Sequence, residues 1–216
     1  MSTTPAAVFW DMDGTLIDSE PLHERSLVAA LRALGIDPPK DLHSRVVGVA
    51  ARPVYDMFVA EHGLSIPFAE WIERKYAHYL ANTHELLARP GAVEAYRALE
   101  QRGVPQVIVS NSDRIIVDTN MNALGLTRPA AKSISRADVR NPKPDPEPYL
   151  RAAYLVGVDP GDCAVIEDSV PGATAGVEAG MRTYLWAPEP TTPPAGAVLV
   201  LTPEELFYHL GLSEQD

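Results

Sequence analysis

Five short apolar runs along this chain, each followed by polar or turn-forming residues, are typical of buried β-strands. They cover residues 6–10, 105–109, 163–166, 182–186 and 197–201. A strand that is buried on both faces is apolar along its whole length. We therefore expect these runs to form a sheet that is covered on both sides.

Stretches of helical periodicity separate these runs. Apolar residues recur every three or four positions over residues 91–99, 115–124 and 147–156, and each stretch ends at or near a glycine. A last helix is expected after Thr202, which has the character of an N-cap and is followed by Pro203. Strands that alternate with helices predict an α/β fold with a Rossmann-like, doubly wound parallel sheet.

Residues 19–88 interrupt this alternation. Their apolar spacing predicts helices alone, over residues 21–34, 53–62 and 68–81. We expect an all-helical cap domain, inserted after the first strand of the sheet. Residues 1–18 and 89–216 would then form the α/β core domain, and residues 19–88 the cap domain.

The composition narrows the possible partners. The 216 residues include 46% hydrophobic and 22% charged residues and carry a formal net charge of −11, with a sequence pI near 4.9. This composition is typical of a globular protein. The acidic balance argues against nucleic acid or an anionic membrane as a partner, because both are bound through basic patches. No apolar run approaches the length of a membrane span.

Cysteine content and the N-terminus bear on location and assembly. The single cysteine, Cys163, rules out an internal disulfide and lies in an apolar run, where a buried position is expected. The first five residues lack the form of a signal peptide. We therefore expect a cytoplasmic protein. We also expect a monomer, because no long apolar stripe is left over.

Polar side chains follow the apolar runs at the ends where parallel strands meet. Asp11 and Asp13 follow the first run, Ser110 the second, and Glu167 and Asp168 the third. In open α/β sheets ligands bind beyond the carboxyl ends of the strands, so these residues are expected to share one crevice. Neighbouring carboxylates repel each other there, and a bound cation, or a nucleophile with its acid/base partner, would offset that repulsion.

Each of these signals has an ordinary alternative. The first acidic pair could be a solvated turn, and Ser110-Asn111-Ser112 could be a strand-to-helix turn with an N-cap. Lys143, which lies among prolines, could be a solvated loop residue. The second acidic pair could open a helix, whose dipole favours acids. The joint occurrence of the four signals favours a functional site.

Taken in order, the four motifs resemble the signature of the haloacid dehalogenase (HAD) superfamily. They are Asp11-Met12-Asp13-Gly14-Thr15, Ser110-Asn111, Lys143 within residues 141–145, and Glu167-Asp168. The resemblance extends from about Ala7 to the C-terminus. With its helical insert, the chain resembles the branch that contains small-molecule phosphatases and beta-phosphoglucomutase. This implies a Mg²⁺-dependent phosphatase of a small phosphorylated metabolite, with a sugar phosphate expected, and an aspartyl-phosphate intermediate.

The resemblance also implies a role for each motif residue. Asp11 would be the nucleophile, and Asp13 would protonate the leaving oxygen and then activate water. Ser110, Asn111 and Lys143 would hold the transferring phosphoryl group.

The same resemblance implies a Mg²⁺ site made of oxygen ligands. These would be Asp11, the backbone carbonyl of Asp13 and Asp168, with Glu167 bound directly or through water. Four acids in one crevice would repel strongly without cations. The metal and Lys143 would therefore help to hold the site together.

Three residues of the expected cap domain are candidates for contact with the substrate. His23 lies at the same distance along the chain from the nucleophile as a histidine that takes part in acid/base catalysis in the mutase. Its position fits a structural histidine at a hinge or helix cap equally well. Arg52 lies where this branch has a loop that contacts the substrate. It could instead be a solvated residue at the start of a helix. Lys75 could face the crevice, whereas Trp71 and Tyr79 on the same helix are expected to pack.

Other activities compete with the phosphatase. In a beta-phosphoglucomutase a sugar hydroxyl, rather than water, would take the phosphoryl group from Asp11. Thr15, Val47 and Asn111 depart from the residues expected of that mutase. Dehalogenation is disfavoured because Asp13 provides an acid that carbon–halogen cleavage does not require. A receiver domain is disfavoured because there the acid pair precedes the acceptor, and an inactive interaction protein is disfavoured because no motif residue is missing.

Overall fold

A computed structural model describes residues 4–46, 49–187 and 191–212 and divides the chain into two compact units. The first combines Met1–Asp18 with Leu87–Asp216, and the second is Ser19–Leu86. We refer to them as the α/β unit and the helical unit. Val47, whose identity separates the two enzyme predictions, lies outside the described residues.

A six-stranded, all-parallel sheet in the order β5-β4-β1-β6-β7-β8 forms the centre of the α/β unit. Its strands are β1 (Ala7–Trp10), β4 (Gln106–Val109), β5 (Lys132–Ile134), β6 (Cys163–Glu167), β7 (Arg182–Trp186) and β8 (Ala197–Val200). Each predicted apolar run is a strand. On central β1, Phe9 is in register with Val107 of β4 and Val165 of β6. The predicted α/β class is confirmed.

Two features of the strands were not predicted from the apolar pattern. β5 is a short edge strand that begins with Lys132 and Ser133, so it has no continuous apolar run. A second, antiparallel sheet pairs β2 (Ile17–Asp18) with β3 (Leu87–Ala88). Strands of two residues are too short to show a periodicity.

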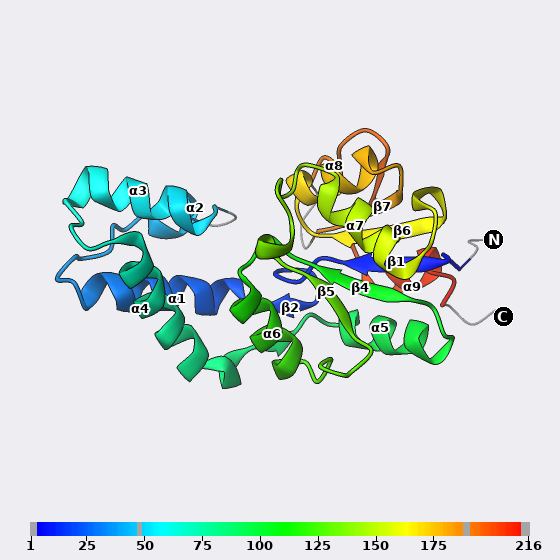
Figure 1. Ribbon diagram of the computed structural model, residues 1–216, viewed down its shortest axis with the longest axis horizontal. Coiled ribbons are helices and arrows are strands. Elements are labelled where there is room, and N and C mark those ends of the chain that lie inside the picture. Colours follow the sequence, from blue (N-terminus) through cyan, green and yellow to red (C-terminus); the bar gives the residue numbers. More distant parts are fainter. Residues whose placement is uncertain (1–3, 47–48, 188–190, 213–216) are drawn as a thin grey trace. The chain divides into compact units, whose positions relative to one another are not determined.

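Helices cover both faces of the main sheet (Figure 1). On one face lie α7 (Glu147–Val156) and α8 (Val170–Glu178), and on the other lie α5 (Ala92–Gln101) and α6 (Arg114–Ala123). The predicted doubly wound arrangement is therefore confirmed.

The apolar core under α7 and α8 includes Phe9, Val107, Tyr149, Ala152, Val165 and Ala175. The last helix, α9 (Pro203–His209), begins as predicted, because the Thr202 hydroxyl accepts a hydrogen bond from the Glu205 amide at 3.2 Å. Two short 3₁₀ turns, η2 (Arg136–Asp138) and η3 (Pro160–Asp162), precede α7 and β6.

The helical unit contains α1 (Glu20–Arg32), α2 (Leu42–Val46), α3 (Ala51–His62), α4 (Phe68–Ala81) and a 3₁₀ turn, η1 (Thr83–Glu85). Its core includes Leu27, Leu31, Phe58 and Trp71. Trp71 and Tyr79 are fully buried, which confirms their predicted packing role. Within the described ranges, every helix of the chain is too short or too polar to cross a bilayer.

Candidate active site

The loop after β1 is closed tightly enough to fix the two acids that it carries. The Leu16 and Ile17 amides donate to the Met12 carbonyl, at 2.9 and 3.1 Å, and the Gly14 amide donates to the Ile17 carbonyl at 2.8 Å. Gly14 has φ +85°, and a Cβ there would lie 2.1 Å from Oδ2 of Asp168. Glycine is therefore required both by the turn and by the approach of that carboxylate.

Lys143 lies at the centre of the site and is almost completely buried. Its ammonium donates to Oδ1 of Asp11 at 2.6 Å, to Oε1 of Glu167 at 2.6 Å and to the Val109 carbonyl at 2.7 Å. An ammonium has three donors, and these three acceptors use all of them. The interpretation of Lys143 as a solvated loop residue is therefore wrong.

The Glu167 carboxylate is held from several sides. Besides Lys143, the Tyr149 hydroxyl donates to Oε1 at 2.6 Å, and the Ser169 hydroxyl donates to Oε2 at 3.1 Å. The Lys143 ammonium also lies 5.0 Å from the centre of the Tyr149 ring. A Cβ at Gly172 would lie about 2.0 Å from this carboxylate, so glycine is needed for the close approach of α8.

Negative charge exceeds positive charge in this cluster. Burial, followed by the neighbouring Glu167, raises the pKa of Asp11 well above its ordinary value. The same two causes raise the pKa of Asp168 to about 7. Burial alone would lower the pKa of Lys143, but Asp11 and Glu167 raise it above the ordinary lysine value. Lys143 is therefore charged and offsets only part of the repulsion.

The remaining negative charge lies where a dication fits. Asp11, Glu167 and Asp168 each offer a carboxylate oxygen, and these oxygens lie within 4.8 Å of one another. The Thr15 hydroxyl donates to Oδ1 of Asp168 at 3.2 Å and orients that carboxylate. Three hard oxygen donors with unneutralised charge suit Mg²⁺ or a similar cation.

Asp13 points toward the end of β4. Its Oδ2 accepts hydrogen bonds from the Ser110 hydroxyl at 3.2 Å and the Ser112 hydroxyl at 2.8 Å. Its Oδ1 accepts a hydrogen bond from the Asn120 amide at 3.0 Å. The structure thus brings the first and second motifs into direct contact.

Asn111 holds the loop that carries Lys143. Its side-chain amide donates to the Lys143 carbonyl at 3.1 Å, and its carbonyl accepts from the Lys143 amide at 3.1 Å. Glu147 secures the same loop by accepting from the amides of Arg140 and Asn141, at 3.1 and 2.9 Å. The Asn111 side chain is therefore engaged in positioning Lys143, and a phosphate contact from this residue would come most simply from its backbone amide.

Arg89 ties the loop after β1 to the end of β7. It donates to the carbonyls of Gly14, at 3.0 Å, and Trp186, at 2.6 Å, and its guanidinium lies 3.8 Å from the centre of the Trp186 ring. Burial lowers the pKa of Arg89. These contacts hold the loop after β1 next to the end of β7.

The three candidates in the helical unit lie on different helices. His23, on α1, stacks on Tyr79 with ring centres 4.5 Å apart. Arg52, on α3, forms an ion pair with Asp56 at 2.9 Å. Lys75 is half-buried on α4. Their proposed contacts with substrate stay predictions.

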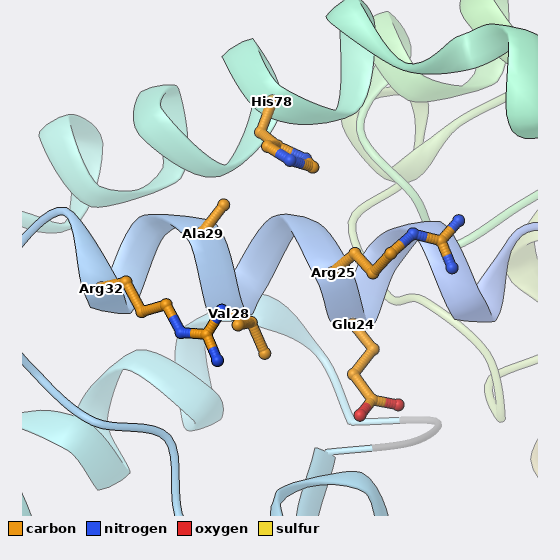
Figure 2. Close-up of a pocket in the computed structure, with 6 residues that line it drawn as sticks. All are labelled: Glu24, Arg25, Val28, Ala29, Arg32 and His78. Atoms are coloured by element: carbon orange, nitrogen blue, oxygen red, sulfur yellow. The ribbon is translucent and has the colours of Figure 1, made fainter.

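A pocket that the sequence did not predict lies on the helical unit itself. It is lined by Glu24, Arg25, Val28, Ala29, Arg32 and His78 (Figure 2). These residues come from α1 and α4, and the candidates His23, Arg52 and Lys75 are not among them.

Several residues of the site are not among those predicted from the sequence. Asn120 carries a detectable signal, because it is a polar residue on the apolar face of the helix predicted over residues 115–124. Ser112 lies next to a motif, at a position where the sequence predicts only a turn. Tyr149 and Arg89 carry no signal of their own, because a tyrosine in a helix and an arginine near a turn are common.

Comparisons with known proteins agree with this geometry. A family model of haloacid dehalogenase-like hydrolases matches residues 5–180. The 6-phosphogluconate phosphatase of Escherichia coli (strain K12) is 32% identical over 192 residues, which cover 87% of this chain and 85% of that protein.

Two solved structures are similar over nearly their whole length. A HAD family hydrolase from Deinococcus radiodurans R1, with bound phosphate and sodium, is 29% identical, with a TM-score of 0.72 over 97% of this chain and 98% of that one. CbbY from Rhodobacter sphaeroides in complex with phosphate has a TM-score of 0.84 over 97% of this chain and 100% of that one. At 23% identity, the second match shows the fold alone.

Proposed function

Because this chain belongs to the haloacid dehalogenase-like hydrolases, we propose that it hydrolyses a small phosphorylated metabolite, foremost a sugar phosphate, through an aspartyl-phosphate on Asp11. The chain is a phosphoric monoester hydrolase. The main support for the aspartyl-phosphate mechanism is the buried Lys143 ammonium, which lies 2.6 Å from both Asp11 and Glu167. It fixes one oxygen of Asp11 and supplies positive charge where a phosphoryl group would be transferred.

In the first step, Asp11 would attack the phosphorus atom with Oδ2, since Lys143 binds Oδ1. A bond forms between this oxygen and phosphorus, and the bond between phosphorus and the leaving oxygen breaks. Asp13, in its protonated form, would give its proton to that leaving oxygen. The Ser110 hydroxyl would donate to another phosphoryl oxygen. The Lys143 ammonium, whose three donors are already used, would supply positive charge beside the phosphoryl group.

In the second step, the carboxylate left on Asp13 would take a proton from water. The water oxygen would bond to phosphorus, and the bond to Asp11 would break. Inorganic phosphate then leaves, Asp11 is again a carboxylate, and Asp13 again carries a proton, so the cycle balances.

Mg²⁺ is the proposed cofactor, held by Asp11, the backbone carbonyl of Asp13 and Asp168. When bound, it supplies positive charge that stabilises the transferring phosphoryl group. Glu167 already accepts hydrogen bonds from Lys143, Tyr149 and Ser169, so we favour its contact with the metal through water.

The substrate class rests on relatives and on the helical insert. The relative with 32% identity is, by name, a phosphatase of 6-phosphogluconate, a phosphorylated sugar acid. We propose that the helical unit serves as a cap and that His23, Arg52 and Lys75 contribute to substrate choice. The monomeric state and the cytoplasmic location stay predictions.

The mechanism is tested by Asp11→Asn. An amide has nearly the shape of the carboxylate but is a poor nucleophile, so release of phosphate from p-nitrophenyl phosphate should fall by at least about 10³-fold. Circular dichroism checks that the fold is intact. A folded variant with undiminished phosphate release would contradict the proposal.

Substrate and reaction type are tested together with a panel of phosphorylated metabolites, with and without Mg²⁺. We expect Mg²⁺-dependent release of inorganic phosphate and the highest kcat/KM for a sugar phosphate. A mutase would use the same core residues, so glucose-1-phosphate is included in the panel. Accumulation of glucose-6-phosphate in place of free phosphate would favour the mutase.

A further inference from the structure

Asn120 is a polar residue in an apolar place. It lies on α6 and is fully buried, on the face of the helix that it shares with Ile116, Val117 and Met121. A buried amide is unfavourable unless it is hydrogen-bonded. A hydrophobic side chain of similar size would pack there more simply, so the amide calls for an explanation.

The explanation is its contact with Asp13, a residue 107 positions away in the sequence. The Asn120 amide donates to Oδ1 of Asp13 at 3.0 Å, while Ser110 and Ser112 donate to Oδ2 at 3.2 and 2.8 Å. The last torsion of an aspartate is broad, so its carboxylate plane is poorly fixed by sterics alone. Donors on both oxygens fix that plane.

Ser110 and Asn120 differ in whether they can keep their hydrogen bond to Asp13 when substrate is bound. Under the proposed function, Ser110 donates to the phosphoryl group, and a hydroxyl has a single proton to donate. Its hydrogen bond to Asp13 is then lost while substrate is bound. Asn120 comes from the helix rather than from the phosphate-binding loop, so its hydrogen bond does not compete with phosphate.

We propose that Asn120 is a positioning residue that holds the carboxyl group of Asp13 in line with the leaving oxygen. The inference rests on the proposed role of Asp13 as the proton donor. Displacing a catalytic group by about 1 Å can lower the rate by about 10²-fold. Loss of the Asn120 amide should therefore impair the step in which Asp13 acts, while Asp11 and Lys143 remain in place.

Two aryl phosphates of nearly the same shape isolate that step. Phenol is a poor leaving group and needs a proton, whereas p-nitrophenol leaves readily without one. The ratio kcat/KM covers the reaction up to departure of the leaving group. Asn120→Leu should lower kcat/KM for phenyl phosphate by about 10- to 100-fold and for p-nitrophenyl phosphate by less than about 3-fold.

Asn122→Leu is the matched control, because Asn122 is an exposed asparagine on the same helix. This substitution should leave kcat/KM unchanged for both phenyl phosphate and p-nitrophenyl phosphate. Asn120→Ala is measured in the same way and provides a second variant for the test if Asn120→Leu does not fold. An equal fall for both substrates, or no fall for either, overturns the inference.

Asp13→Asn separates this inference from the proposed function. If Asp13→Asn shows the large, leaving-group-dependent loss and Asn120→Leu does not, the inference is overturned and the proposed function stands. If Asp13→Asn itself shows no dependence on the leaving group, the role of Asp13 is overturned, and the inference with it.

Discussion

Replacing Asp168 with asparagine should stabilise the metal-free protein at about pH 8 and remove its response to Mg²⁺. Burial, and then Glu167, raises the pKa of Asp168 from 3.8 to about 7 in the folded protein. An unfolded aspartate titrates near the ordinary value. Between these two pH values the folded state therefore holds a proton that the unfolded state has lost, and the free energy of unfolding falls as the pH rises from about 4 to about 7.

The size of the effect follows from the same values. A pKa raised from 3.8 to about 7 corresponds, at about 1.4 kcal/mol for each pKa unit, to about 4 kcal/mol of lost stability above pH 7. Asparagine has the same shape without the charge, and its carbonyl can still accept the Thr15 hydrogen bond, which is 3.2 Å long in the native protein. The variant should therefore regain up to about 4 kcal/mol at about pH 8.

Urea unfolding at about pH 5, 6, 7 and 8, in EDTA and in Mg²⁺, measures this effect. The difference between the native protein and the variant is compared at each pH, so that titrating groups that do not interact with residue 168 cancel. Mg²⁺ at about 100 times its Kd should stabilise the native protein by about 2.7 kcal/mol, and the variant far less. Asp37→Asn, at an exposed position, is the control. A variant that is less stable than the native protein at pH 8 in EDTA would show that the Asp168 charge does not destabilise the metal-free fold.

Three other substitutions test how the site is held together. Lys143→Met should lower the free energy of unfolding by about 3–5 kcal/mol at neutral pH, because Asp11 and Glu167 lose their shared buried cation; an unchanged urea midpoint would contradict this. Tyr149→Phe keeps the ring but removes the donor to Glu167, and should lower unfolding free energy by about 1.5–3 kcal/mol in the same assay. Backbone amides just before Lys143 lower the pKa of Glu147 to about 2, so its contribution to stability is present above pH 4.5 and lost as pH falls toward 2. Glu147→Gln should therefore be less stable than the native protein at neutral pH, with a gap that narrows below about pH 5; a gap independent of pH would count against it.

Most of the sheet could be predicted from the sequence because its strands are buried on both faces. Residues 163–166, for example, form one apolar run and become β6, whose side chains are all buried. β5 could not be predicted in this way, since Lys132 and Ser133 lie on an edge strand with one exposed side. The pattern of apolar residues indicates which strands are buried, and it gives no signal for a strand that is only partly covered.

The meeting of the motifs could also be predicted, because the carboxyl ends of parallel strands lie together. Asp11 and Asp168 follow neighbouring strands β1 and β6, and they lie in one acidic cluster. The contacts of the loops could not be predicted. Position in the sequence does not show that Asn111 binds the backbone of Lys143, or that Asn120 reaches Asp13 from a helix.

Chemical trapping shows whether a phosphoryl group is carried by residue 11 during turnover. The enzyme is mixed rapidly with p-nitrophenyl phosphate and Mg²⁺, quenched with acid within one turnover, and treated with borohydride, which reduces an aspartyl-phosphate to homoserine. Mass spectrometry of the peptide that contains residue 11 then locates the change. We expect homoserine in place of Asp11, and none in the untreated enzyme. An unmodified Asp11 in an active enzyme, or modification at another acid, would contradict an aspartyl-phosphate on Asp11.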